Sequence, residues 1–120
     1  MFDWLNRKLN EREDRIFAAE LPDLLPLLFI EHSAKPIPNE RNDDRGRRSF
    51  DYAIAAVATP DLLLRFIRVR GEIGVHTSPP NGPRKWDELD LPLGCHDWSS
   101  IDIYLSSNWK TITAPPPPEP

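Results

Sequence analysis

The chain has 120 residues, of which 39% are hydrophobic and 28% are charged, and its formal net charge is -4. These values fit one small folded domain with a single core and argue against nucleic acid as a partner, because phosphate binding depends on an excess of Lys and Arg. The first ten residues include charged side chains, and no apolar stretch approaches the ~20 residues of a membrane span, so we expect neither a secretory signal nor a membrane segment.

The N-terminal part of the chain is predicted to be helical. Apolar residues recur at nearly helical spacing over residues 2–21, and Asn10 followed by Glu13 is typical of a helix start. We expect a helix over about residues 10–20, and an earlier turn from Asp3 is compatible with the same spacing. Pro22 is tolerated at a first helical position, so a second short helix is expected over residues 22–28.

The next segment leads from an expected edge strand into a polar loop. Residues 27–33 are apolar and then mixed, and the prolines that follow exclude a central strand. Residues 39–48 contain no apolar side chain and should form a solvated loop. The arginines of this loop alternate with acids to give a net charge of only +1, which argues against phosphate binding.

The middle of the chain predicts an antiparallel meander. Three strand-length runs occupy residues 50–58, 62–69 and 72–77, separated by turn sequences at 59–61 and 70–71. Both faces of the second run are apolar, so helices should cover at least one face of the sheet.

The C-terminal part is predicted to be a loop followed by a helix and a tail. Residues 78–83 are rich in proline and glycine, and residues 86–91 are mixed in character. Apolar residues from Ile101 to Ile112 follow a helical period, although Ile101, Ile103 and Leu105 also alternate as in a strand. We favour a helix over residues 99–111 because Ser99 is a good N-cap.

These elements together predict an α+β fold with a fixed order of parts. An N-terminal helix or helices precede an antiparallel meander of three to four strands, and a C-terminal helix packs on the sheet. The single domain covers residues 1–114, and residues 115–120 form a proline-rich extended tail.

No motif for catalysis, metal binding or a cofactor is recognised. Cys95, His96 and Asp97 are adjacent, but a working Cys–His pair is normally assembled from distant segments. His32, His76 and His96 lack the short paired spacings of zinc ligands. A single cysteine fits a reducing compartment, so we expect a cytoplasmic protein without cofactors.

Acidic and aromatic residues gather near the end of the chain. Residues 86–109 carry five acids and no Lys or Arg, whereas residues 1–85 have a net charge of +1. Large aromatic residues in a charged surface are typical of interface hot spots, although tryptophans also pack in cores, as we expect for Trp109. The predicted partner-binding residues are Trp86, Asp87, Glu88, Asp90, Asp97 and Trp98.

Three short motifs resemble those of a group of small bacterial proteins. They are Ser49-Phe50, the segment Leu64-Arg65-Phe66-Ile67-Arg68-Val69-Arg70-Gly71, and Trp86-Asp87-Glu88-Leu89. Proteins of this kind resemble immunity proteins of bacterial toxin systems, which are small acidic α+β domains that bind and block a toxin. The resemblance covers about half of the chain and assigns no functional residue.

The sequence therefore favours a non-enzymatic intracellular binding protein that holds a basic protein partner through its acidic, aromatic C-terminal surface. An immunity protein is one form of this hypothesis. The alternative is a structural or self-associating domain that forms homo-oligomers through a sheet edge or the Trp-bearing helix. An enzyme that uses Cys95 with a histidine is a third hypothesis.

Overall fold

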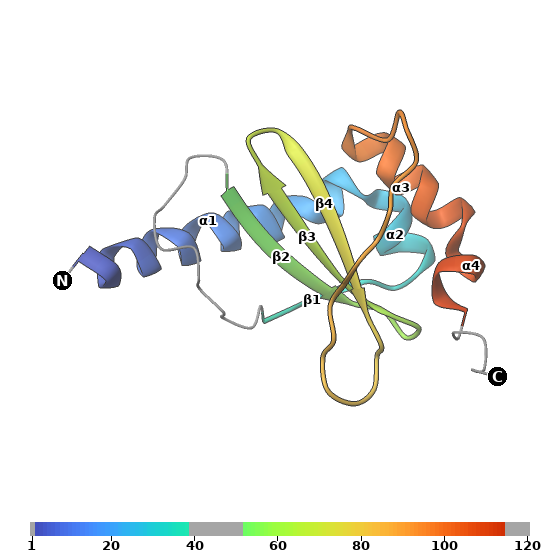
Figure 1. Cartoon of the computed structure of the whole chain (residues 1–120), viewed down its shortest axis with the longest axis horizontal. Helices are drawn as coiled ribbons and strands as arrows, with labels where there is room; N and C mark the ends of the chain where they lie inside the picture. Colours follow the sequence, from blue (N-terminus) through green and yellow to red (C-terminus); the bar gives the residue numbers. More distant parts are fainter. Residues whose placement is uncertain (1, 39–51, 115–120) are drawn as a thin grey trace.

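The computed structural model describes residues 2–38 and 52–114, and it confirms the α+β class (Figure 1). The polar loop 39–48 and the proline-rich tail 115–120 lie outside the described residues. The elements in chain order are α1 (Phe2–Leu24), α2 (Pro26–Glu31), β1 (Lys35–Ile37), β2 (Tyr52–Ala58), β3 (Leu63–Val69), β4 (Glu72–Ser78), β5 (Asp87–Glu88), α3 (Trp98–Ser107) and α4 (Trp109–Thr113).

The strands form one antiparallel sheet in the order β1-β2-β3-β4-β5. The predicted meander is confirmed by β2, β3 and β4, because β2 pairs with β3 and β3 pairs with β4 over seven residues each. The described part of the sheet has five strands, where three to four were expected, because the short segments β1 and β5 pair along its two edges. β5 has only two residues, too few to show a strand period in the sequence.

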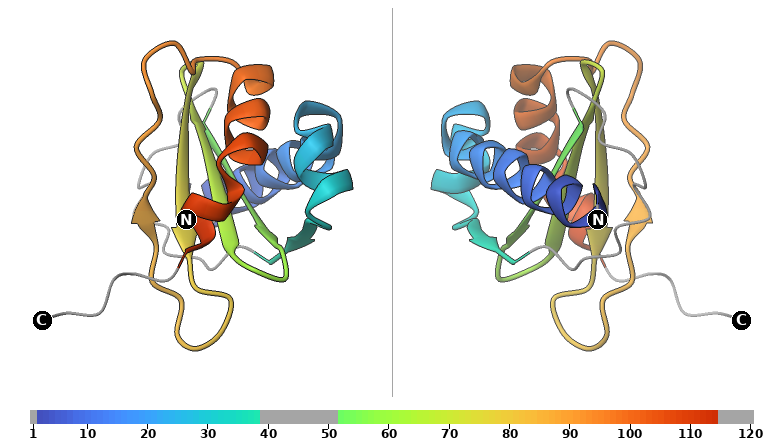
Figure 2. Two further views of the ribbon diagram at one scale, coloured as in Figure 1. Left: turned by 90° about the vertical axis from the view of Figure 1, so that its right-hand side faces the viewer. Right: turned by 90° about the vertical axis from the view of Figure 1, so that its left-hand side faces the viewer.

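The helices lie on one face of the sheet, as the edge-on views in Figure 2 show. Phe17, Leu21, Leu25 and Leu28 recur at three- or four-residue spacing from α1 into α2, and each is fully buried. They join Val57, Leu64, Phe66 and Val75 of the sheet and Ile101 and Leu105 of α3 in one core. Burial of this continuous apolar cluster is the main force that holds the layers together.

The first helix is longer than the sequence predicted. α1 begins at Phe2 and continues through Pro22 to Leu24, and it is Pro26, not Pro22, that starts the second helix. Pro22 costs about 3 kcal/mol in a helix interior because it removes a backbone hydrogen bond. Burying the neighbouring Leu21 and Leu25 at about 1.5–3 kcal/mol each offsets that cost.

The expected edge strand lies later in the chain than predicted. Residues 27–31 belong to α2, and the strand is β1, which pairs with Ala56, Val57 and Ala58 of β2. Leu28 is fully buried on the helical face, so its burial selects the helix over an extended conformation. Pro36 lies within β1, where an edge position tolerates its missing N–H.

The C-terminal helix is confirmed, but it consists of two helices. α3 begins after Asp97, whose side chain accepts a hydrogen bond from the Ser100 N–H, so Asp97 and not Ser99 is the N-cap. The helix ends at Asn108, whose side chain donates to the Tyr104 carbonyl, and α4 follows. The strand alternative for this segment is wrong, because Ile101 and Leu105 are buried while Ile103 between them is 55% exposed.

Candidate functional site

The segment from residue 86 to residue 96, which we call the strap, connects the sheet to α3. The Lys85 N–H donates to the Ser78 hydroxyl at one end, β5 pairs with His76 and Thr77, and the Leu89 N–H donates to the Val75 carbonyl. The strap then leaves the edge of β4 and crosses to α3 (Figure 2). Its position is therefore fixed by backbone contacts along β4.

Trp86 lies half-buried at the start of the strap. The guanidinium carbon of Arg65 lies 4.8 Å from the centre of its ring, which is a cation–π contact. Arg65 is opposite His76 on β4, and His76 is opposite Glu88 on β5. Because directly opposed residues share a face, these three side chains form a row on the sheet face away from the helices.

Three carboxylates of the strap face solvent. Asp87, Glu88 and Asp90 are exposed, and within the described part of the chain none of them makes an ion pair. The strap contains no Lys or Arg, so its own charge is -3 from these three acids. The structure thus brings four of the six predicted partner-binding residues together on one anchored segment.

His76 does not neutralise the strap. Burial lowers the pKa of its imidazole below the ordinary value of 6.5, the Arg65 charge lowers it further, and Glu88 opposes both effects. The imidazole is consequently uncharged at neutral pH. The negative charge of Glu88 therefore remains available to a ligand from outside.

Asp97 and Trp98 make contacts with α3 and with the core, which the strap carboxylates do not make. Hydrogen bonds from the side chain and the backbone of Ser100 lower the pKa of Asp97, which keeps this N-cap ionised. The Trp98 ring packs 5.5 Å from the Phe17 ring and 6.1 Å from the Phe66 ring, measured between centroids. Trp98 accordingly helps to close the core, and we place it outside the candidate docking surface.

One acid that the sequence assigned to the charged C-terminal region is buried. Asp102 is only 3% exposed, and its two carboxylate oxygens accept hydrogen bonds from the N–H groups of Leu27 and Leu28, each at 3.0 Å. These N–H groups open α2, and the residue at its N-cap position, Leu25, supplies no side-chain hydrogen bond. Asp102 therefore caps α2 from α3 and adds nothing to a surface patch.

Trp109 packs in the core, as the sequence predicted. Its ring is 8% exposed and stacks on the His32 ring with centroids 4.2 Å apart. Its indole N–H donates to the Asp61 carboxylate at 3.2 Å. Trp109 thus fixes α4 against the β2–β3 turn.

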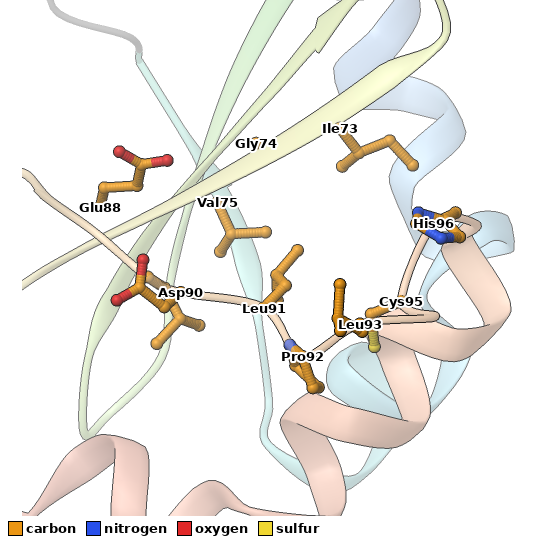
Figure 3. Close-up of a pocket in the computed structure, with 11 residues that line it drawn as sticks. Ile73, Gly74, Val75, Glu88, Asp90, Leu91, Pro92, Leu93, Cys95 and His96 are labelled. Carbon is orange, nitrogen blue, oxygen red and sulfur yellow. The ribbon is translucent and has the colours of Figure 1, made fainter.

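Two cavities flank the strap. One, of about 310 Å³, lies between β4 and the strap and includes Glu88 and Asp90 in its lining (Figure 3). The other, of about 630 Å³, lies between β4, the β2–β3 turn and α4, and includes Asp87. We call the first the strap cavity. This cavity could not be predicted from the sequence, because its walls come from two segments whose separation depends on where the strap leaves β4.

Two side chains of the Cys95-His96-Asp97 segment make hydrogen bonds to the start of α3. The Cys95 thiol donates to the Ser100 carbonyl at 3.5 Å, and the Asp97 carboxylate caps α3. Among the described residues, no group of three metal-ligating side chains is found, and no helix is long and apolar enough to cross a membrane.

Comparisons with protein-family models, with curated proteins and with solved structures found no match. The strap is an anchored sheet-edge segment, and it presents a half-buried tryptophan beside three carboxylates that make no ion pair with any residue of the described ranges 2–38 and 52–114.

Proposed function

We propose that this protein is a non-enzymatic intracellular binding protein that holds a basic protein partner through the strap. The observation that carries the proposal is the cluster of Asp87, Glu88 and Asp90, which are exposed and free of ion pairs in the described part of the chain. Asp87 and Glu88 pair with β4, and Asp90 follows the Leu89 N–H that donates to the Val75 carbonyl. Complementary charge accelerates association and excludes partners of like charge. Trp86, held by Arg65, supplies the adjoining aromatic surface.

An immunity protein that blocks a basic toxin is the specific form of this proposal that the sequence resemblance supports. The shared motifs include Trp86-Asp87-Glu88-Leu89, which is the beginning of the strap. Edge pairing between copies of the chain is the competing mode of association. The sheet edges are formed by β1, with three residues and an internal proline, and by the two-residue β5, and short edges of this kind disfavour strand pairing.

A capture experiment tests the proposal with matched variants. Immobilised wild type is compared with Glu88→Gln/Asp90→Asn, which removes two strap charges, and with Asp23→Asn/Glu31→Gln, which removes two exposed charges from the helices. Proteins retained from host lysate are quantified by mass spectrometry, and circular dichroism checks the fold of each variant.

We expect wild type and the helix variant to retain the same basic proteins and the strap variant to lose them. Equal retention by all three folded proteins would contradict the proposed surface.

A further inference from the structure

The strap cavity exists because the strap separates from β4. β5 ends at Glu88, and the Leu89 N–H makes the last hydrogen bond along this edge, 2.8 Å to the Val75 carbonyl. Ile73 and Gly74 continue β4 beyond that point, and the strap runs opposite them at a distance that leaves about 310 Å³ of open space. This volume is at the lower end for ligand pockets and suits one long side chain.

The lining of the strap cavity combines two kinds of surface. Ile73 and Leu91, both partly exposed, provide apolar side chains, and Glu88 and Asp90 bring carboxylates. Figure 3 shows these two carboxylates at the same end of the cavity, with Leu91 and Ile73 extending away from them. A ligand in the cavity therefore meets the apolar side chains of Ile73 and Leu91 and the negative charges of Glu88 and Asp90.

Leu93 lies at the rim of the strap cavity. It is fully exposed, at 103%, in a turn closed by the Cys95 N–H donating to the Pro92 carbonyl at 3.1 Å. The turn also contains Gly94 at a φ of 93°, a conformation that favours glycine. A single exposed leucine is ordinary on a protein surface, but here it extends the apolar wall of the strap cavity outward.

We propose that the strap cavity receives one lysine or arginine side chain of the protein partner. The aliphatic stem lies against Ile73 and Leu91, and the cationic head lies between the carboxylates of Glu88 and Asp90. Lysine and arginine are the residues that combine an apolar stem with a cationic end. This inference depends on the proposed function and names the feature of the basic partner that the strap recognises.

Other side chains fit this lining less well. An apolar side chain would cover Glu88 and Asp90 without pairing them, and taking an unpaired carboxylate out of water is costly. An acidic side chain would be repelled by the same two groups. Charge complementarity therefore selects a cation.

Two peptides of equal charge and different stem length test the inference. Each is a capped peptide of the form Gly-X-Ser-X-Ser-X-Gly, in which X is either lysine or 2,4-diaminobutyrate, whose stem is two methylenes shorter. Binding to the full chain is followed by two-dimensional NMR, using the amide signals of Gly74, Leu89 and Leu91. We expect the lysine peptide to bind roughly tenfold more tightly, because two more methylenes are buried.

Gly74→Val provides a steric check. A Cβ at this position would lie 3.9 Å from the Ile67 Cβ, which is an ordinary contact. Because Gly74 lines the strap cavity, the valine side chain would reduce the space in it. We expect this variant to bind both peptides with equal affinity. If it fails to fold, the comparison of the two peptides on the wild type still decides the question.

The outcomes separate the two proposals. If both peptides bind equally to the wild type and the Glu88→Gln/Asp90→Asn variant binds neither, the cavity inference is overturned and the proposed function stands. If neither peptide shifts the strap signals of the wild type, the proposed function fails and the cavity inference fails with it.

Discussion

At the scale of single residues, Asp102 links the two helical parts of the fold. Its carboxylate accepts from two N–H groups of α2 while the residue itself belongs to α3, so one side chain orders two elements. No local sequence pattern predicts these hydrogen bonds, because the two N–H groups are 74 and 75 residues away from Asp102. Only the packing of α2 on α3 brings them into contact.

Replacing Asp102 with alanine should destabilise the protein by about 2–3 kcal/mol, because two N–H groups lose a charged acceptor in a mostly buried setting. Asp102→Asn keeps one acceptor oxygen and should have an intermediate effect. Urea denaturation measures both changes. Asp90→Ala, at an exposed position, is the control and should change stability by less than about 0.5 kcal/mol. An Asp102→Ala variant as stable as this control would refute the capping role.

At the scale of elements, Trp86 makes a specific contact that attaches the beginning of the strap to the sheet. The stacking of Arg65 on the indole ring attaches the beginning of the segment to the outer face of β3. The hydrogen bond from Leu89 to Val75 lies three residues further along. Loss of the ring should therefore loosen the segment without disturbing the core.

We expect Trp86→Ala to accelerate amide hydrogen exchange over residues 86–90 while exchange over β3 stays unchanged. Trp86→Phe keeps an aromatic face for Arg65 and should show a smaller increase. Exchange is followed by mass spectrometry of peptides that cover the two segments. Unchanged exchange over residues 86–90 in Trp86→Ala would show that the stacking does not anchor the strap.

Some elements could be predicted from the sequence, and others depended on distant contacts. The strands β2, β3 and β4 begin and end within two residues of their predicted bounds, because apolar runs and turn residues are local signals. The end of α1 was predicted wrongly at Pro22. The helix continues past this proline because its neighbouring apolar residues are buried against other elements, and this burial cannot be inferred from the local sequence. β5 could not be predicted for the same reason, since its two residues form a strand only by pairing with β4.

The candidate site was predicted only in part. The gathering of Trp86, Asp87, Glu88 and Asp90 followed from composition, because residues this close in sequence stay close on an extended segment. Asp97 and Trp98 were predicted as part of the same surface, but their side chains cap α3 and pack on the core. The strap cavity could not be predicted, because it depends on the distance between β4 and the strap.

At the scale of the whole molecule, the helices cover one face of the sheet and the acidic strap follows the β4 edge (Figure 2). With Asp102 buried, four of the five acids of residues 86–109 remain exposed, and three of these four, Asp87, Glu88 and Asp90, lie together on the strap. These three groups are the electrostatic basis for the proposed binding of a basic partner.

The salt dependence of partner binding tests this basis most directly. The affinity of the purified partner is measured at 50 and 300 mM NaCl for the wild type, for Glu88→Gln/Asp90→Asn and for Asp23→Asn/Glu31→Gln. Exposed charges are screened at the higher concentration, so the wild type and the helix variant should bind several-fold more weakly there. The strap variant should bind weakly at both concentrations. Wild-type affinity that is independent of salt and unchanged in the strap variant would contradict the account.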